Sequence, residues 1–217
     1  MRSGARVVAA VVVLGVLVAA LYDLYGPWRG RLNDFDAAAA ARSEAAMWRA
    51  DQADNDGLQF RVTAAQLRSR YHLPFLRSYS VAYEMARATY LFDRGRARSE
   101  YTQVLPHLEK YYGAIRAVNR AAFDPARAAQ LELERWIVRR QRAEHGPEDL
   151  ATAVAALQAE IHALPRAAFA EHGRLYAEAV ALRDARAPED GPTTDEWRRI
   201  DDLLRASWEA LWRAVQS

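Results

Sequence analysis

Residues 7–22 read VVAAVVVLGVLVAALY, an uninterrupted apolar run that ends at Asp23. A helix needs about 20 apolar residues to cross the ~30 Å hydrocarbon core of a bilayer, so this run is slightly short. Arg6 can extend its charge back toward the headgroups, and Trp28 suits the interfacial zone beyond the run. The stretch therefore predicts a transmembrane anchor over residues 7–28, with the lipid bilayer as the first partner.

The same stretch also fits a cleaved signal peptide. Residues 1–6 are short and basic, an apolar segment follows, and small residues occur at 18–20. The basic residues that flank the run are nearly balanced, because Arg29 and Arg31 follow it. The very short basic N-terminus favours a cytoplasmic N-terminus. Either interpretation predicts that most of the chain lies outside the cytoplasm, in a periplasmic position if the membrane is a bacterial inner membrane.

The rest of the chain has the three-and-four spacing of apolar residues that is typical of amphipathic helices. No alternating, strand-like run bounded by hairpin turns occurs. We therefore predict an all-α protein in which a transmembrane or signal-anchor helix is followed by a soluble antiparallel bundle of about six helices. The bundle covers residues 29–186, residues 187–192 form a polar linker, and residues 193–217 form a C-terminal helix that packs on the bundle.

Several residues mark the expected ends of these helices. Asp124-Pro125 combines a capping side chain with proline in the first turn, and Thr193 with Glu196 has the capping-box spacing. Asn33 or Asp34 is expected to cap the first helix after the anchor. Its periodicity continues past Asn55-Asp56-Gly57 to Tyr71, which indicates one long helix with a weak point or two helices in line. Pro106 is expected to kink or restart its helix.

Composition excludes some functions. The chain has 30 basic residues, and without Arg2 and Arg6 the remaining 28 balance 28 acidic residues. Since basic and acidic residues are interspersed, no cluster exists to neutralise nucleic-acid phosphates, and we predict no nucleic-acid partner. The chain contains no cysteine, which excludes disulfides, thiolate zinc sites and iron–sulfur clusters.

No catalytic motif is present. The glycines form no phosphate-binding loop, and no serine-nucleophile motif occurs. A di-metal site in a helical bundle would need a histidine three residues after a glutamate, and none of the five histidines has that position. We therefore predict no catalytic residue, no metal ligand and no cofactor.

A polar pocket between helices is a second hypothesis. His172 and Tyr176 share one face of their predicted helix, and Glu132 lies on the same side of its helix as Trp136. The pocket candidates are Glu44, Glu84, Glu132, Arg139, His172 and Tyr176. Each also has a structural interpretation, namely a half-buried histidine bonded to a carbonyl group, or ion pairs that set the register of the bundle.

The last helix has a wide apolar face on which tryptophan recurs. Core packing is the default explanation, because aromatic rings bury a large area. The alternative is a docking surface made of Trp208, Leu211 and Trp212, since such rings also supply the strongest contacts of interfaces.

An anchored bundle without reactive motifs is more useful as a binding module than as a catalyst. The sequence therefore favours a membrane-anchored accessory or scaffold protein that binds another membrane-associated protein. The alternative is a small-ligand-binding or enzymatic bundle, which requires the pocket candidates to converge on one cavity. A structural protein of the cell envelope is a third hypothesis.

Overall fold

The computed structural model describes residues 2–142, 144–186 and 191–217, and every regular element in these ranges is a helix, which confirms the all-α prediction. After α1 (Arg2–Tyr25), the described ranges hold eight helices of 15 to 23 residues. Seven of them lie within 29–186, where about six were expected, and the eighth is the expected C-terminal helix. These are α2 (Ala37–Gln52), α3 (Asp56–Tyr71), α4 (Phe75–Arg94), α6 (Leu105–Asn119), α7 (Pro125–Arg140), α8 (Pro147–His162), α9 (Ala170–Ala185) and α10 (Thr194–Gln216). Shorter segments are α5 (Arg98–Tyr101), η1 (Thr102–Val104) and η2 (Arg166–Phe169).

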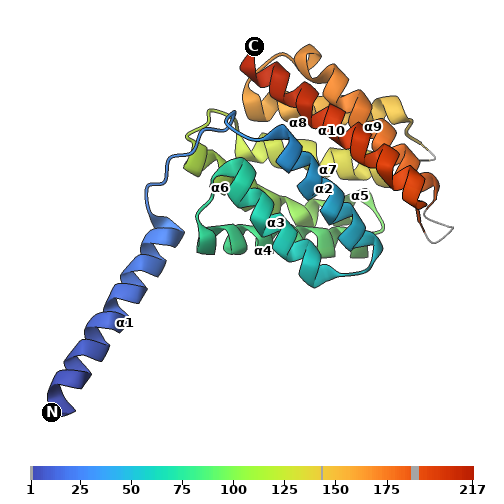
Figure 1. The fold of residues 1–217 in the computed structure, drawn as a ribbon. Coiled ribbons are helices and arrows are strands. Elements are labelled where there is room, and N and C mark those ends of the chain that lie inside the picture. The colour runs from blue at the N-terminus through green and yellow to red at the C-terminus, as the bar shows by residue number, and fades with distance from the viewer. Residues whose placement is uncertain (1, 143, 187–190) are drawn as a thin grey trace.

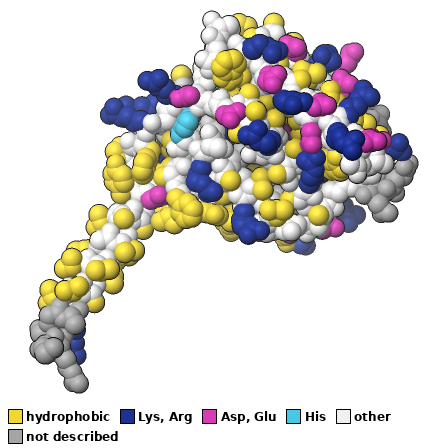
Figure 2. Space-filling view, viewed as in Figure 1, with side chains coloured by type: hydrophobic (Ala, Val, Ile, Leu, Met, Phe, Trp, Pro, Cys, Tyr) yellow, Lys and Arg dark blue, Asp and Glu magenta, His cyan; other side chains and the backbone are white. Residues whose placement is uncertain are grey.

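Helix α1 projects away from the body of the molecule (Figure 1). Its valine and leucine side chains from Val7 to Leu21 are exposed, as the space-filling view shows (Figure 2). Within the described residues, α1 is the one helix that is long and apolar enough to cross a bilayer, and a signal sequence has the same properties.

The predicted start signals hold at three helices. The Asp124 side chain accepts a hydrogen bond from the Ala126 N–H at 3.0 Å, and Thr193 and Glu196 form the capping box of α10. Pro106 lies in the first turn of α6, so it starts that helix rather than kinking it. The prediction for α2 was wrong, because Asp36 is its cap and accepts from the Ala39 N–H at 3.0 Å.

Helices α2 and α3 pack against each other instead of lying in line. The chain turns at Asp54, which adopts the left-handed conformation with φ of 48°. Asn55 then caps α3 by accepting a hydrogen bond from the Leu58 N–H at 2.9 Å. Two helices of 16 residues that pack against each other thus replace the one long helix, or the two helices in line, that the continuous periodicity suggested.

The eight longer helices close into a ring. Each packs against the next, in the order α2, α3, α4, α6, α7, α8, α9 and α10, and α10 returns to pack against α2. Most connections between them are short, which places consecutive helices side by side. The predicted linker at 187–192, between α9 and α10, lies outside the described residues at positions 187–190.

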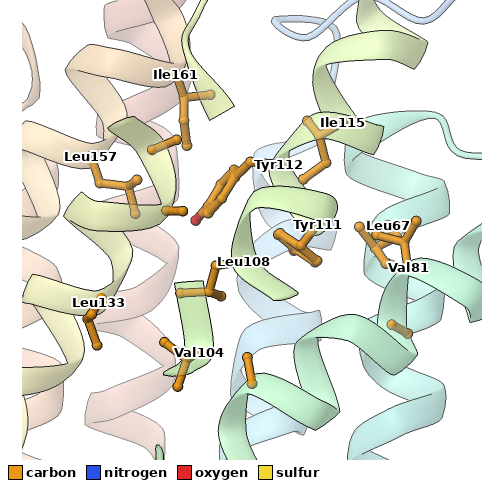
Figure 3. Close-up of a cluster of buried hydrophobic side chains, with 14 of the residues drawn as sticks. Leu67, Val81, Val104, Leu108, Tyr111, Tyr112, Ile115, Leu133, Leu157 and Ile161 are labelled. Atoms are coloured by element: carbon orange, nitrogen blue, oxygen red, sulfur yellow. The ribbon is translucent and has the colours of Figure 1, made fainter. Parts of the chain in front are cut away.

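Two apolar cores hold the ring together. One joins α3, α4, α6, α7 and the end of α8, and Figure 3 shows Tyr112 of α6 reaching toward Leu157 and Ile161 of α8. The other joins α2, α8, α9 and α10 around Trp48 and Leu204. Because the apolar residues gather into two clusters, polar side chains are able to occupy the space between them.

The segment between α1 and α2 covers one end of the ring. The Gly30 N–H donates to the Val118 carbonyl at 2.9 Å, and Asn33 contacts His162 of α8 and the Val215 carbonyl of α10. Gly30 lies so close to α6 that a Cβ atom there would approach Asn119 Oδ1 to 2.6 Å. Since Phe35 is also buried, this segment seals the end of the ring nearest α1.

Candidate functional site: a central cavity

A cavity of about 1010 Å³ lies inside the ring, and all eight longer helices contribute to its wall. Its deep part is lined by buried side chains such as Glu44, His172 and Trp208. Its mouth is lined by exposed residues at the turn between α2 and α3 and at the end of α4, including Asp54 and Tyr90. The mouth therefore opens at the end of the ring opposite the sealing segment.

One wall of the cavity carries a continuous chain of hydrogen bonds that starts at α10. The Trp208 indole N–H donates to Glu44 Oε2 at 2.7 Å. The Tyr176 hydroxyl is also hydrogen-bonded to the Glu44 carboxylate. Arg135 in turn donates to the Tyr176 oxygen at 2.9 Å. This half of the chain links α10, α2, α9 and α7 across the interior.

The other half of the chain lies on α7. Arg135 makes two bonds to Glu132, from Nε at 3.0 Å and from Nη2 at 2.6 Å. The Trp136 indole N–H donates to Glu132 Oε1 at 2.8 Å. Such a two-pronged contact between arginine and carboxylate fixes both side chains in orientation as well as distance.

Burial and neighbouring charges both shift the pKa values of the side chains on this wall. It raises the pKa of Glu44, although Arg135 and the hydrogen bonds from Trp208 and Tyr176 oppose the shift. Burial, with the charge of Glu44, raises the pKa of Tyr176 to about 12. Burial alone would lower the pKa of Arg135, but the adjacent Glu132 carboxylate raises it well above its ordinary value. Glu44 thus keeps its proton to a higher pH than an ordinary glutamate does.

Five of the six pocket candidates line this cavity. Glu44, Glu132, His172 and Tyr176 are buried in its wall. Arg139 also lines it and contacts Asp184 at 3.4 Å. The sixth, Glu84, lies outside the cavity, on the side of α4 that faces α6. There it contacts His107 at 2.6 Å and Lys110 at 3.6 Å, which is the ion-pair role that the sequence left open.

His172 joins α9 to α10. Its Nδ1 lies 2.9 Å from the Ser207 carbonyl oxygen, and the Ser207 hydroxyl donates to the His172 carbonyl at 3.0 Å. The tautomer with a proton on Nδ1 donates a hydrogen bond to the Ser207 carbonyl oxygen. Burial lowers the pKa of His172 to about 4, so the ring is neutral near pH 7.

We expect the burial of the neutral His172 ring to lower the free energy of unfolding in mild acid. The unfolded histidine binds a proton near pH 6.5, whereas the folded one does so near pH 4. The unfolded state therefore holds more protons between these values, and stability falls as the pH decreases through this window. The loss should reach about 3 kcal/mol by pH 4. Unfolding free energies at several pH values for the wild type and His172→Asn measure it, and equal pH dependence in both would contradict it.

Two of the three proposed partner-binding residues are buried within the chain. Leu211 has no exposed surface, and Trp208 is 6% exposed and lines the cavity. Trp212 remains accessible, with 42% of its surface exposed. Of the proposed docking surface, only Trp212 is available to another molecule in this conformation.

Two arginines whose side chains lie in the interior, Arg135 and Arg70, were not among the pocket candidates. Arg135 is three residues after Glu132, a spacing that was available as a signal. Arg70 follows Leu67 by three residues on the buried stripe of α3, and its guanidinium lies 4.2 Å from the Phe35 ring centroid and 4.6 Å from that of Trp208. None of its side-chain nitrogens reaches a hydrogen-bond acceptor within the described part of the chain.

No group of three or more histidine, aspartate or glutamate side chains is arranged to bind a metal among the residues that the structure describes. The chain matches no protein-family model, no curated protein and no solved structure. The geometry of the cavity therefore carries the functional argument.

Proposed function

We propose that this chain is a membrane-anchored binding protein that holds a small amphipathic molecule in its central cavity. The observation that carries the proposal is the cavity of about 1010 Å³ with the Glu44–Tyr176–Arg135–Glu132 hydrogen-bond chain on one wall. Ligand pockets commonly enclose about 300–1,000 Å³ and combine an apolar lining with a few well-placed polar groups. This cavity is at the upper end of that range.

The two kinds of wall suggest the character of the ligand. Phe60, Met85 and Leu157 supply apolar surface, and methionine adapts easily to an irregular partner. Glu44 of α2 and Tyr176 of α9 offer a carboxyl group and a hydroxyl group. A buried polar network contributes less stability than apolar packing of the same volume, so its presence favours a binding role. The ligand would place a hydrogen-bonding group at Glu44 and an apolar part against α3, α4 and α8.

Location is part of the proposal. Helix α1 would be retained as a single-pass anchor, with the bundle on the extracytoplasmic side. The proposal is supported by the length of the apolar run in α1 and by the two arginines that precede this run, at positions 2 and 6. The accessory or scaffold hypothesis, with an unidentified protein partner, remains a prediction. Of the three residues proposed for that partner, Trp212 is the one exposed enough to contact it.

Mass spectrometry of the full chain, purified from native membranes in mild detergent, tests the ligand. We expect a stoichiometric small amphiphile in the wild type. Glu44→Gln keeps the shape of the side chain and should weaken binding roughly tenfold through lost hydrogen-bond strength. Ala86→Trp adds bulk on α4 where it lines the cavity.

Ser80→Trp is the matched control, because Ser80 is exposed on the same helix and does not line the cavity. The amphiphile should persist in Ser80→Trp and decline several-fold in Ala86→Trp. Absence of any stoichiometric molecule from the wild type, or equal retention in both tryptophan variants, would refute the proposal.

A further inference from the structure

The outward face of α4 is unusually apolar for a surface helix. Beyond α1, six large hydrophobic side chains of the described residues are exposed, and four of them belong to α4. These four are Phe75, Leu76, Tyr83 and Tyr90, with exposures of 56%, 38%, 59% and 49%. Leu76, Tyr83 and Tyr90 are seven residues apart, so they align along one side of the helix. Figure 2 shows hydrophobic side chains along the lower edge of the body, next to the root of α1.

This face is attached directly to the end of α1. Asp23 Oδ1 accepts hydrogen bonds from the Leu76 N–H at 2.7 Å and the Arg77 N–H at 3.1 Å. Pro74, the residue before α4, makes no side-chain cap of its own. Asp23 thus caps α4 from the anchor side, and the first turn of α4 lies beside the end of the apolar run (Figure 1).

The charges around the face suit an anionic surface. The guanidinium groups of Arg87 and Arg94 lie 5.3 Å and 5.2 Å from the Tyr90 ring centroid. The acidic residues of α4 are engaged elsewhere, since Glu84 contacts α6 and Asp93 contacts Arg140 at 2.6 Å. The face therefore combines aromatic rings with arginines, the composition of helices that lie in the headgroup zone of membranes.

We propose that the outward face of α4 is a second membrane-contact surface, on which the bundle rests against the lipid headgroups. The inference rests on the membrane anchor of the proposed function, because α1 brings α4 to the lipid. It also sets the orientation of the cavity. Tyr90 is both part of this face and part of the cavity mouth, so the mouth lies close to the lipid surface. A ligand drawn from the membrane would have a short path into the cavity.

The absence of native cysteine permits single fluorescent labels in the full chain. The chain is reconstituted into phosphatidylcholine and phosphatidylglycerol vesicles that contain a nitroxide lipid. The nitroxide is on the headgroup when the label is at position 83 or 212, and near the end of the acyl chain when the label is at position 15. Tyr83→Cys reports on α4, Trp212→Cys is the matched exposed aromatic position on α10, and Gly15→Cys reports on α1, where added atoms meet nothing within 4 Å. We expect quenching at position 83 to be several-fold stronger than at position 212.

The three labels separate the possible failures. Quenching at position 83 no stronger than at position 212, with position 15 quenched, would overturn the membrane contact while leaving the anchor intact. An unquenched label at position 15 would remove the anchor and the inference with it. A second comparison adds Leu76→Asp and Tyr90→Asp to the chain labelled at position 83. Quenching should fall several-fold if the face touches lipid, and unchanged quenching would contradict the proposal.

Discussion

Arg135→Ala is expected to lower the free energy of unfolding by about 3 kcal/mol. Its partner Glu132 is buried, with 5% of the side chain exposed, and loses both hydrogen bonds from the guanidinium in the variant. Removing one member of a buried ion pair leaves the other charge without compensation, which costs far more than the pair itself contributes. Tyr176 also loses its donor, so the chain of hydrogen bonds along the cavity wall is broken.

Arg98→Ala provides the matched control. Arg98 also contacts a glutamate at 2.6 Å, but its side chain is 66% exposed and that of Glu134 is 40% exposed. Exposed pairs of this kind contribute about 0–1 kcal/mol. Urea unfolding of both variants in the same detergent measures the difference. Equal losses would mean that water reaches the Arg135–Glu132 pair freely. Adding Glu132→Leu to an Arg135→Leu variant should restore part of the loss, because both charges are then gone.

The local signals in the sequence located most of the helices but not the way in which the helices pack together. Asp124 and Thr193 define helix starts because a cap depends on residues within one turn. The chain reversal between α2 and α3 depends on the left-handed conformation of Asp54. Aspartate adopts this conformation only occasionally, so its presence in the sequence does not specify the turn. Ring closure is less local still, because it brings α10 onto α2 across most of the chain.

The site was only partly predictable, because it too depends on contacts between residues that are far apart in the sequence. Glu44, Glu132 and His172 were recognisable as polar residues that lie within one turn of the apolar stripe of their helix. For Trp208, core packing was the default interpretation and an outer docking surface the alternative. Nothing near it in the sequence indicates Glu44, which is 164 positions away and accepts its indole hydrogen bond. Arg70 was missed because a buried arginine and a surface arginine look alike in sequence. The structure distinguishes them through Phe35, which the sealing segment brings over the guanidinium.

Arg70→Met should raise the free energy of unfolding, by about 1–4 kcal/mol. Arg70 is 1% exposed, and its guanidinium nitrogens have no hydrogen-bond acceptor in the described part of the chain. Its contacts with the Phe35 and Trp208 rings recover part of the cost of burying the charge, about 2 kcal/mol for a well-placed ring. The desolvation of a buried ion is several kcal/mol, so an apolar side chain of similar length packs more favourably.

Arg68→Met, two residues earlier on α3, is the matched control for Arg70→Met. Arg68 is only half-buried and donates to the Ser78 hydroxyl at 2.8 Å, so its replacement should cost about 1 kcal/mol. Opposite signs for the two variants in thermal and urea unfolding are the expected outcome, and a loss of stability in Arg70→Met would contradict it. The charge of Arg70 also lowers the pKa of Glu44, so its removal should favour the protonated carboxyl group. A more stable Arg70→Met variant that retains less of the amphiphile would indicate that the buried charge is kept for binding at the expense of stability.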